Sequence, residues 1–151
     1  MRYVVLGNSV AGIAAADAIR THDPDGTITI VSNERAYGYS RAMLPLYIAG
    51  KRRKRDLVFA SREFYSARRI RLLRGVAAEA VEPRERQVNL SSGKRLGYDR
   101  LLVATGSSSR ALKVPGAELA GIFPLRQMVD AEAIRRMRLP PGERFEPRVT
   151  V

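Results

Sequence analysis

The 151-residue sequence predicts an α/β fold with a parallel sheet and a small antiparallel β-meander. One observation is a strand, a helix and a second strand within about thirty residues of the start, a pattern that predicts two parallel strands joined by a right-handed crossover. Another is a series of short strand-like segments between residues 70 and 98, separated by turn-forming residues. A chain of this length can bury a substantial hydrophobic core as one domain.

The parallel part of the sheet begins at residues 2–7, whose apolar run is typical of a buried strand. Residues 10–21 predict a helix, and its small side chains allow it to pack closely against the sheet. Residues 27–31 are rich in β-branched side chains and follow the turn-forming residues 23–26, so they predict the second strand.

The middle of the chain combines irregular and regular patterns. Residues 32–50 are irregular, apart from a helical turn that begins near residues 46–49. A short helix is predicted at residues 61–67, with Ser61 as its N-cap and an acidic residue in its first turn. Residues 70–73 predict another strand.

The meander is predicted by three short strands, near residues 75–81, 87–90 and 95–98. Turn-forming residues at 82–85 and 91–93 separate these strands, which predicts antiparallel neighbours.

The last third of the chain predicts one more strand and a final helix. Residues 100–104 are a continuous apolar strand, and residues 127–138 carry apolar side chains at helical spacing. Residues 148–151 are similar to the start of a further strand, so we expect the chain to be shortened relative to a complete fold.

Composition excludes several functional classes. No apolar run approaches the roughly 20 residues that span a bilayer, and the first strand begins too early to leave room for a signal peptide, so we expect a cytoplasmic protein. The sequence has no cysteine, which excludes disulfides, thiolate metal sites and thiol redox catalysis. The single histidine, His22, adjoins a turn, and we expect neither a metal site nor a histidine-based catalytic triad.

Positive charge is concentrated in the middle of the chain. The formal net charge is +12, and residues 51–100 hold 15 basic side chains against 6 acidic ones. The densest run, residues 51–55, is either a solvated loop in an arginine-rich protein or a surface for nucleic acid or another polyanion. We favour the solvated loop, because no interleaved aromatic residues or recognition-helix motif accompany the run.

The most informative motif is Gly7-Asn8-Ser9-Val10-Ala11-Gly12, between the first predicted strand and the first predicted helix. A tight, glycine-containing turn at such a junction directs backbone N–H groups and the positive end of a helix toward a pyrophosphate. Ser9 stands where the fingerprint has a glycine, but it keeps its backbone N–H. The motif therefore predicts a bound dinucleotide.

Two further residues support a dinucleotide. Ala16 follows Gly12 by one helical turn, where a small side chain lets the helix pack close to the strand. Glu34 follows the second predicted strand, where a carboxylate can accept hydrogen bonds from ribose hydroxyls. The alternative for Glu34 is an ordinary surface charge at a strand end.

With these motifs, the sequence resembles flavoproteins of the pyridine nucleotide-disulfide oxidoreductase superfamily, in particular cysteine-free reductases of the ferredoxin, rubredoxin and nitrite reductase types. The segments that carry the resemblance are residues 4–12, 30–45 and 98–107. The resemblance implies a Rossmann-like FAD/NAD(P)-binding fold that is incomplete relative to the family. It also implies FAD as the cofactor of this chain, with NAD(P)H used by full-length members.

The resemblance implies which residues bind FAD. Those around the pyrophosphate would be Gly7, Ser9, Val10, Ala11 and Gly12. Those at the adenosine ribose would be Asn33 and Glu34, and the residue reaching the pyrophosphate or flavin would be Arg41. Ala78 would contact the adenine, and the residues near the flavin would be Ala104, Thr105 and Gly106. Each has a structural alternative, as a turn glycine, a surface charge or a core residue, and no catalytic side chain or metal ligand is implied.

The sequence differs from the family pattern at positions that would lie near the flavin, and these differences limit the redox chemistry that its side chains can supply. Ala42 stands where some members carry a redox cysteine, so thiol chemistry is excluded. Leu46 stands where a lysine near the flavin is frequent, and the sequence contains no Gly-Asp dipeptide of the kind that contacts the flavin in the family.

We therefore expect the FAD-binding portion of an NAD(P)H-dependent oxidoreductase that passes electrons through flavin to an acceptor. Residues 1–139 would form the FAD-binding domain, and residues 140–151 a linker and the start of an NAD(P)-binding domain. The expected partner is an acidic electron-acceptor protein or a complementary chain, and neither a membrane nor nucleic acid is expected. The alternative is a non-catalytic nucleotide-binding module that acts with another chain. In both cases we expect the chain alone to be inactive.

Overall fold

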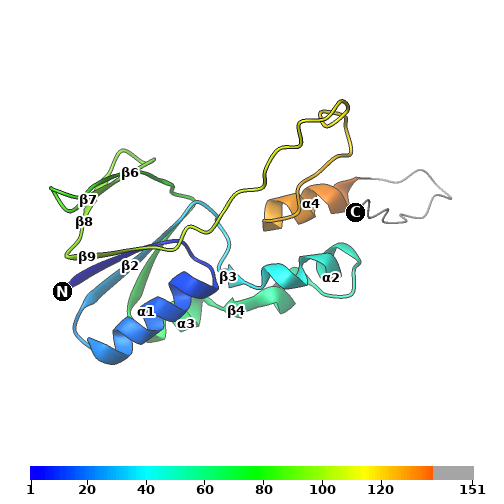
Figure 1. Ribbon diagram of the computed structural model, residues 1–151. Coiled ribbons are helices and arrows are strands. Elements are labelled where there is room, and N and C mark those ends of the chain that lie inside the picture. The colour runs from blue at the N-terminus through cyan, green and yellow to red at the C-terminus, as the bar shows by residue number, and fades with distance from the viewer. Residues whose placement is uncertain (138–151) are drawn as a thin grey trace. The chain divides into compact units, whose positions relative to one another are not determined.

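A computed structural model describes residues 1–137 of the protein, in which two units are distinguished (Figure 1). Unit 1 contains Met1–Ser40 and Arg53–Ser107, and unit 2 contains Arg41–Arg52 and the chain from Ser108 onward. The expected domain boundary after residue 139 and the strand-like residues 148–151 lie outside the described residues. Within residues 1–137, no helix has the length and apolar character needed to cross a membrane.

Unit 1 is built on a parallel sheet with the strand order β5-β2-β1-β9. Its strands are β1 (Arg2–Leu6), β2 (Thr27–Ser32), β5 (Ile70–Arg74) and β9 (Arg100–Val103). Val5 of β1 is opposite Ile30 on one side and Leu102 on the other, so the first predicted strand lies inside the sheet. This position explains its continuous apolar run, because a strand of a parallel sheet is covered on both faces.

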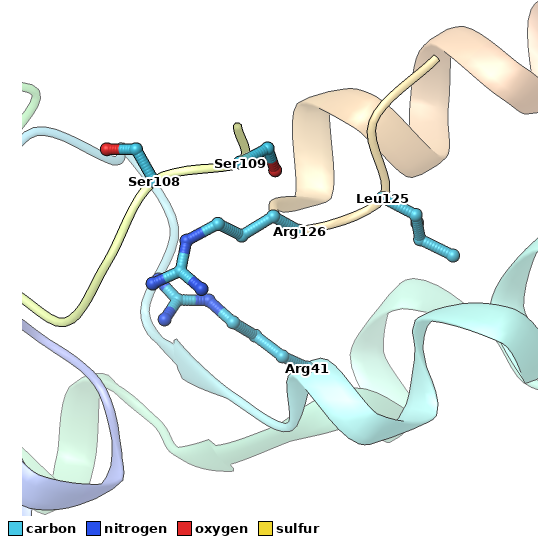
Figure 2. A pocket seen from close by; sticks show the side chains of 5 residues that line it. All are labelled: Arg41, Ser108, Ser109, Leu125 and Arg126. Carbon is cyan, nitrogen blue, oxygen red and sulfur yellow. The ribbon is translucent and has the colours of Figure 1, made fainter. Parts of the chain in front are cut away.

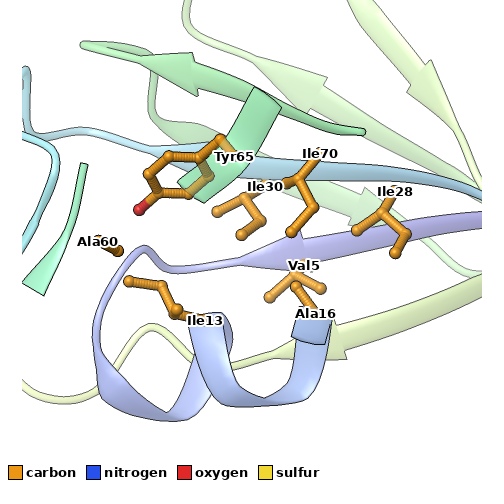
Figure 3. Packing of buried hydrophobic residues seen from close by; sticks show 8 residues of the cluster. All are labelled: Val5, Ile13, Ala16, Ile28, Ile30, Ala60, Tyr65 and Ile70. Atoms are coloured by element: carbon orange, nitrogen blue, oxygen red, sulfur yellow. The ribbon is translucent and has the colours of Figure 1, made fainter. Parts of the chain in front are cut away.

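Two helices cover one face of the sheet: α1 (Val10–His22) and α3 (Arg62–Ala67). The buried side chains on this face are shown in Figure 3 and are Val5, Ile13, Ala16, Ile28, Ile30, Ala60, Tyr65 and Ile70. Each large aliphatic side chain buried here contributes about 1.5–3 kcal/mol. Ser61 precedes α3 as predicted, but its hydroxyl donates to the Glu63 carboxylate (2.6 Å) and does not cap a backbone amide.

The antiparallel meander covers the other face of the sheet. Its strands, in the order β6-β7-β8, are β6 (Ala78–Glu82), β7 (Gln87–Leu90) and β8 (Arg95–Gly97). Val4 and Leu6 point to this face because side chains alternate along a strand, and they pack with the fully buried Val88 of β7. The predicted meander is confirmed, although β6 begins three residues after the predicted start.

Three short elements of unit 1 were not predicted. They are β3 (Gly38–Tyr39), the 3-10 helix η2 (Lys54–Leu57) and β4 (Val58–Ala60). β3 and β4 pair with each other, with Gly38 opposite Ala60, where a side chain on Gly38 would meet the tip of Ile13 at 2.4 Å. Pairing between residues so far apart in the sequence leaves no local periodicity to detect.

Up to residue 137, unit 2 contains a 3-10 turn and two helices: η1 (Arg41–Met43), α2 (Leu44–Ile48) and α4 (Met128–Arg136). α2 and α4 contact each other, and the Arg135 guanidinium carbon lies 4.5 Å from the centre of the Tyr47 ring. The helical turn predicted near residues 46–49 begins earlier, with Pro45 in its first turn, a position that proline favours.

Candidate functional site

The glycine-rich turn of unit 1 is packed tightly between two strand ends. Gly7 follows β1, and its N–H donates to the carbonyl of Val31 at the end of β2 (2.9 Å). Its φ of 120° is a backbone conformation that glycine adopts readily and other residues rarely do. A Cβ at this position would lie 2.2 Å from the carbonyl oxygen of Ala104, just beyond β9. The turn can therefore approach β9 only because residue 7 has no side chain.

The start of α1 is equally close to this turn. A Cβ on Gly12 would lie 2.0 Å from the carbonyl oxygen of Gly7. Ser9 is the N-cap residue, and its carbonyl accepts the N–H of Ile13 (2.9 Å). The first turn of α1 holds no acidic side chain. The positive end of the helix is thus suited to an anion, whose charge it stabilises by roughly 0.3–1 kcal/mol.

The predicted ribose ligands follow β2. Asn33 is exposed, whereas Glu34 is half-buried and accepts a hydrogen bond from the Tyr39 hydroxyl (2.6 Å). The Glu34 backbone N–H donates to the hydroxyl of Ser32 (3.2 Å), and its carbonyl accepts the N–H of Gly75 (3.1 Å). The Glu34 carboxylate is therefore held in a defined orientation at the end of the strand.

The segment that precedes β6 lies beside the predicted ribose ligands at the end of β2. The N–H of Val76 donates to the carbonyl of Ser32 (2.9 Å), which fixes residues 75–76 beside the end of β2. Ala78, predicted to contact adenine, follows at the first position of β6, where it is half-buried. It packs against the buried residues between the sheet and the meander, called the meander-side cluster, which are Val4, Leu6, Val31, Val88, Leu90 and Tyr98.

Residues beyond β9 complete this edge of the sheet. The N–H of Ala104 donates to the carbonyl of Leu6 (2.8 Å), while Thr105 and Gly106 are exposed, Gly106 with a φ of 73°. The structure thus brings residues 7–12, 33–34 and 104–106 to the carboxyl ends of adjacent parallel strands, where ligands of open α/β sheets bind.

Unit 2 contains a pocket that is lined by two arginine side chains (Figure 2). Its volume is about 240 Å³, and it is lined by Arg41, Ser108, Ser109, Leu125 and Arg126. Figure 2 shows the guanidinium groups of Arg41 and Arg126 directed into the same space. Two neighbouring positive charges repel each other, so an anion bound between them would be favourable.

Arg126 was not predicted to be a site residue. Its backbone N–H and that of Gln127 donate to the Asp130 carboxylate (2.8 and 2.7 Å), so the start of α4 fixes its position. The sequence has 27 basic residues, and no local pattern distinguishes this arginine from the others. Within residues 1–137, no group of three or more His, Cys, Asp or Glu side chains could hold a metal ion.

Comparison with known proteins identifies relatives over nearly the whole chain. The family model described as Pyridine nucleotide-disulphide oxidoreductase matches residues 1–151. The ferredoxin–NAD(+) reductase component of the biphenyl dioxygenase system from Paraburkholderia xenovorans is 30% identical over 139 residues, which are 92% of this chain and 34% of that protein. The chain therefore spans about a third of the length of this relative.

Solved structures of two reductases are also similar to this chain over most of its length. The putidaredoxin reductase in a covalent complex with putidaredoxin has a TM-score of 0.81 and 34% identity, over 89% of this chain and 33% of that one. The NADH:rubredoxin oxidoreductase from Clostridium acetobutylicum has a TM-score of 0.81 and 30% identity, over 89% and 34% of the two chains. The predicted Rossmann-like FAD/NAD(P)-binding fold, incomplete relative to its relatives, is confirmed.

Proposed function

The chain belongs to the pyridine nucleotide-disulphide oxidoreductase family, as its motifs predicted, and we propose that it is the FAD-binding portion of an NAD(P)H-dependent flavoprotein oxidoreductase. Members of this family are FAD-containing, NAD(P)H-dependent reductases. The chain spans about a third of the relatives that it matches, so the activity of a whole reductase is part of the proposal.

The turn at residues 7–12 is the observation that carries this proposal. Gly7 and Gly12 leave no room for a side chain, and α1 begins at Val10, within this turn. Such a turn suits the pyrophosphate of a dinucleotide, because the phosphate can approach the backbone and the helix end closely.

We assign the remaining contacts in unit 1 by their positions around this turn. Glu34, oriented by Tyr39, would accept hydrogen bonds from the adenosine ribose, with Asn33 beside it. Ala78 would lie against the adenine. The backbone of residues 104–106 would approach the flavin side of FAD.

The paired arginines of unit 2 support a role in phosphate binding. Arg41 and Arg126 present fixed charges, and guanidinium groups form strong, often bidentate hydrogen bonds with phosphate oxygens. Ser108 and Ser109 line the same pocket.

The residues of the chain bind and orient FAD in this proposal, and none acts as a nucleophile or a general base. When bound, FAD supplies the redox chemistry, accepting electrons from NAD(P)H and passing them to an acceptor. The sequence contains no cysteine, so these 151 residues contribute no thiol to the transfer.

The acceptor in this proposal is an acidic electron-transfer protein, and a complementary chain could supply what the 151 residues lack. The relatives support such a partner, because one is named for ferredoxin and another is in a complex with putidaredoxin. The second candidate function is a non-catalytic nucleotide-binding module that acts with another chain. We place the FAD-binding domain at residues 1–139 and assign residues 140–151 to a linker and the start of a nicotinamide domain.

Titration of the purified 151-residue chain with FAD tests the proposal. We expect binding in a calorimeter and flavin absorption that stays with the protein during gel filtration. Arg41→Gln and Arg126→Gln should each weaken FAD binding about tenfold, because each removes a charge-assisted hydrogen bond. Arg110→Gln, an exposed arginine of the same unit, is the matched control. A chain that stays colourless and releases no heat with FAD would contradict the proposal.

A further inference from the structure

Asn8, in the middle of the glycine-rich turn, makes two hydrogen bonds that the dinucleotide proposal does not use. Its side-chain oxygen accepts a hydrogen bond from the Tyr65 hydroxyl of α3 (2.6 Å). Its side-chain nitrogen donates to the carbonyl of Ala36, in the segment between β2 and β3 (3.4 Å). The side chain therefore joins the turn to two segments that are distant in the sequence.

Tyr65 is held firmly at its end of this connection. It is only 3% exposed, and its ring packs against Phe64 (5.4 Å between centroids, edge-on) and Tyr37 (5.9 Å). Figure 3 shows its hydroxyl at the margin of the buried cluster, directed past Ala60 and Ile13. Burial raises the pKa of this hydroxyl, while hydrogen bonds with the Gly38 backbone and with Asn8 lower it. The raised pKa keeps the hydroxyl protonated and able to donate.

Two hydrogen bonds form a connected path, called the circuit below, which runs from the Tyr65 hydroxyl to Asn8 and from Asn8 to Ala36. The backbone then returns to the start of the path at Gly38, where a Cβ would lie 3.1 Å from the Tyr65 hydroxyl oxygen. One side of the circuit is the proposed pyrophosphate turn, and the opposite side is the segment that directly follows Glu34.

We propose that Tyr65 and Asn8 are positioning residues, which hold the pyrophosphate turn and the ribose-side segment at a fixed spacing before the dinucleotide binds. The inference rests on the proposed function and adds residues that need not touch the ligand. A turn ordered in advance loses less conformational entropy on binding, so the circuit increases affinity without adding a contact.

Two variants remove the circuit from opposite ends. Tyr65→Phe deletes the donor and keeps the packed ring, and Asn8→Ala deletes the acceptor. We expect each to raise the Kd of FAD roughly 2- to 12-fold, the range that corresponds to one net hydrogen bond. The double variant should bind FAD no more weakly than the weaker of the two single variants, because either change alone already breaks the connection. Tyr37→Phe, which removes a hydroxyl from the neighbouring ring, is the control and should bind as the unchanged protein does.

Hydrogen exchange of the ligand-free chain tests the circuit independently of FAD. The amides of Gly7 and Ile13, bonded to Val31 and Ser9, flank the turn and should exchange faster in both variants. The amide of Tyr98, bonded to Arg86 beside the meander, should not change. If Tyr65→Phe does not fold, Asn8→Ala alone tests the circuit, because this variant leaves the buried Tyr65 ring in place.

The outcomes separate the two proposals. Failure of the unchanged chain to bind FAD would overturn the proposed function, while faster exchange at Gly7 and Ile13 would still support the circuit. Unchanged exchange in both variants would overturn the circuit. Faster exchange with an unaltered Kd of FAD would overturn the positioning role.

Discussion

Gly7 and Gly12 are the residues at which backbone atoms come too close to admit a side chain. A Cβ on Gly12 would lie 2.0 Å from the Gly7 carbonyl oxygen, and one on Gly7 would lie 2.2 Å from that of Ala104. The motif indicated that these positions need glycine, but not which atoms exclude a larger residue. Because Gly7 has no side chain, the turn can lie against the end of β9, which follows it in the sequence by almost a hundred positions.

Gly12→Ala should lower the free energy of unfolding by about 3 kcal/mol, because the added methyl group meets backbone that cannot move without shifting β1 or α1. Gly93→Ala is the control, since Gly93 has a φ of 76° but no atom within 4 Å of the added Cβ. We expect it to cost about 1 kcal/mol from backbone strain alone. Urea denaturation measures both values, and equal losses would contradict the close approach.

Tyr39→Phe tests the orientation of the Glu34 carboxylate. The variant removes the hydrogen bond from the Tyr39 hydroxyl (2.6 Å) and should raise the Kd of FAD about tenfold, because hydrogen bonds to charged groups are stronger than neutral ones. Tyr98→Phe, a buried tyrosine of the meander-side cluster, is the control. Calorimetric titration provides the comparison, and identical affinities for the two variants would remove Tyr39 from the site.

The elements of unit 1 are joined at the start of β1 by an ion pair. Arg2 donates to the Asp99 carboxylate from its backbone N–H (2.7 Å) and from its guanidinium group (2.8 Å). The N–H of Asp99 in turn donates to the Arg2 carbonyl (2.9 Å), just before β9 begins. The Arg2 hydrogen bonds lower the pKa of the Asp99 carboxyl from 3.8 to about 2.

This shift predicts how stability depends on pH. Because the pKa of Asp99 is lower in the folded protein, its contribution is complete above the unfolded value of 3.8 and is lost as pH falls through about 2. Asp99→Asn should therefore be less stable than the unchanged protein at neutral pH, and the difference should narrow in acid. Urea midpoints measured across this range for both proteins test it, and a constant difference would show that Asp99 does not titrate as described.

Elements with a clear local pattern were predicted, whereas those made by long-range pairing were not. β1, α1 and β2 were predicted to within one residue at each end, because burial on both faces of the sheet imposes a visible pattern. β3 has two residues and exists only through its pairing with β4. Ser61 was predicted to be the N-cap of α3 and lies at that position, but its hydroxyl donates to the Glu63 carboxylate. Helix propensity does not determine which acceptor the hydroxyl binds.

The formal net charge of the whole chain is +12, and its densest basic run is residues 51–55. Residues 51–55 are exposed, and the neighbouring Asp56 offsets part of their charge through contacts with Arg53 and Arg55. The backbone N–H of Arg53 donates to the Asp56 carboxylate (2.9 Å), which lowers its pKa. The exposure of the run and these contacts fit the solvated alternative favoured from the sequence, although Lys54 and Arg55 belong to η2 and not to a loop.

At the level of the whole molecule, we expect no steady-state oxidation of NADH or NADPH by the 151 residues with added FAD and ferricyanide. The relatives that use these cofactors are about three times as long, and the chain matches only about a third of each. Absorbance at the nicotinamide band measures the rate. Turnover above that of free FAD under the same conditions would contradict the expectation, whereas FAD binding without turnover would agree with it.

Local sequence was sufficient to predict the sheet, the meander and the turn at residues 7–12. Their signals are short in range: a periodicity imposed by burial and the special backbone freedom of glycine. The absence of cysteine likewise shows, without any knowledge of the fold, that these 151 residues supply no thiol.

Contacts between distant residues determined the rest. Tyr65 reaches Asn8 across 57 positions, and Arg126 reaches the pocket of Arg41 from the start of another helix. Tyrosine and arginine have the same local preferences at these positions as elsewhere in the chain. Their roles arise only when folding places a donor within hydrogen-bond distance of its acceptor, or one charge beside another, and that proximity is a property of the tertiary structure.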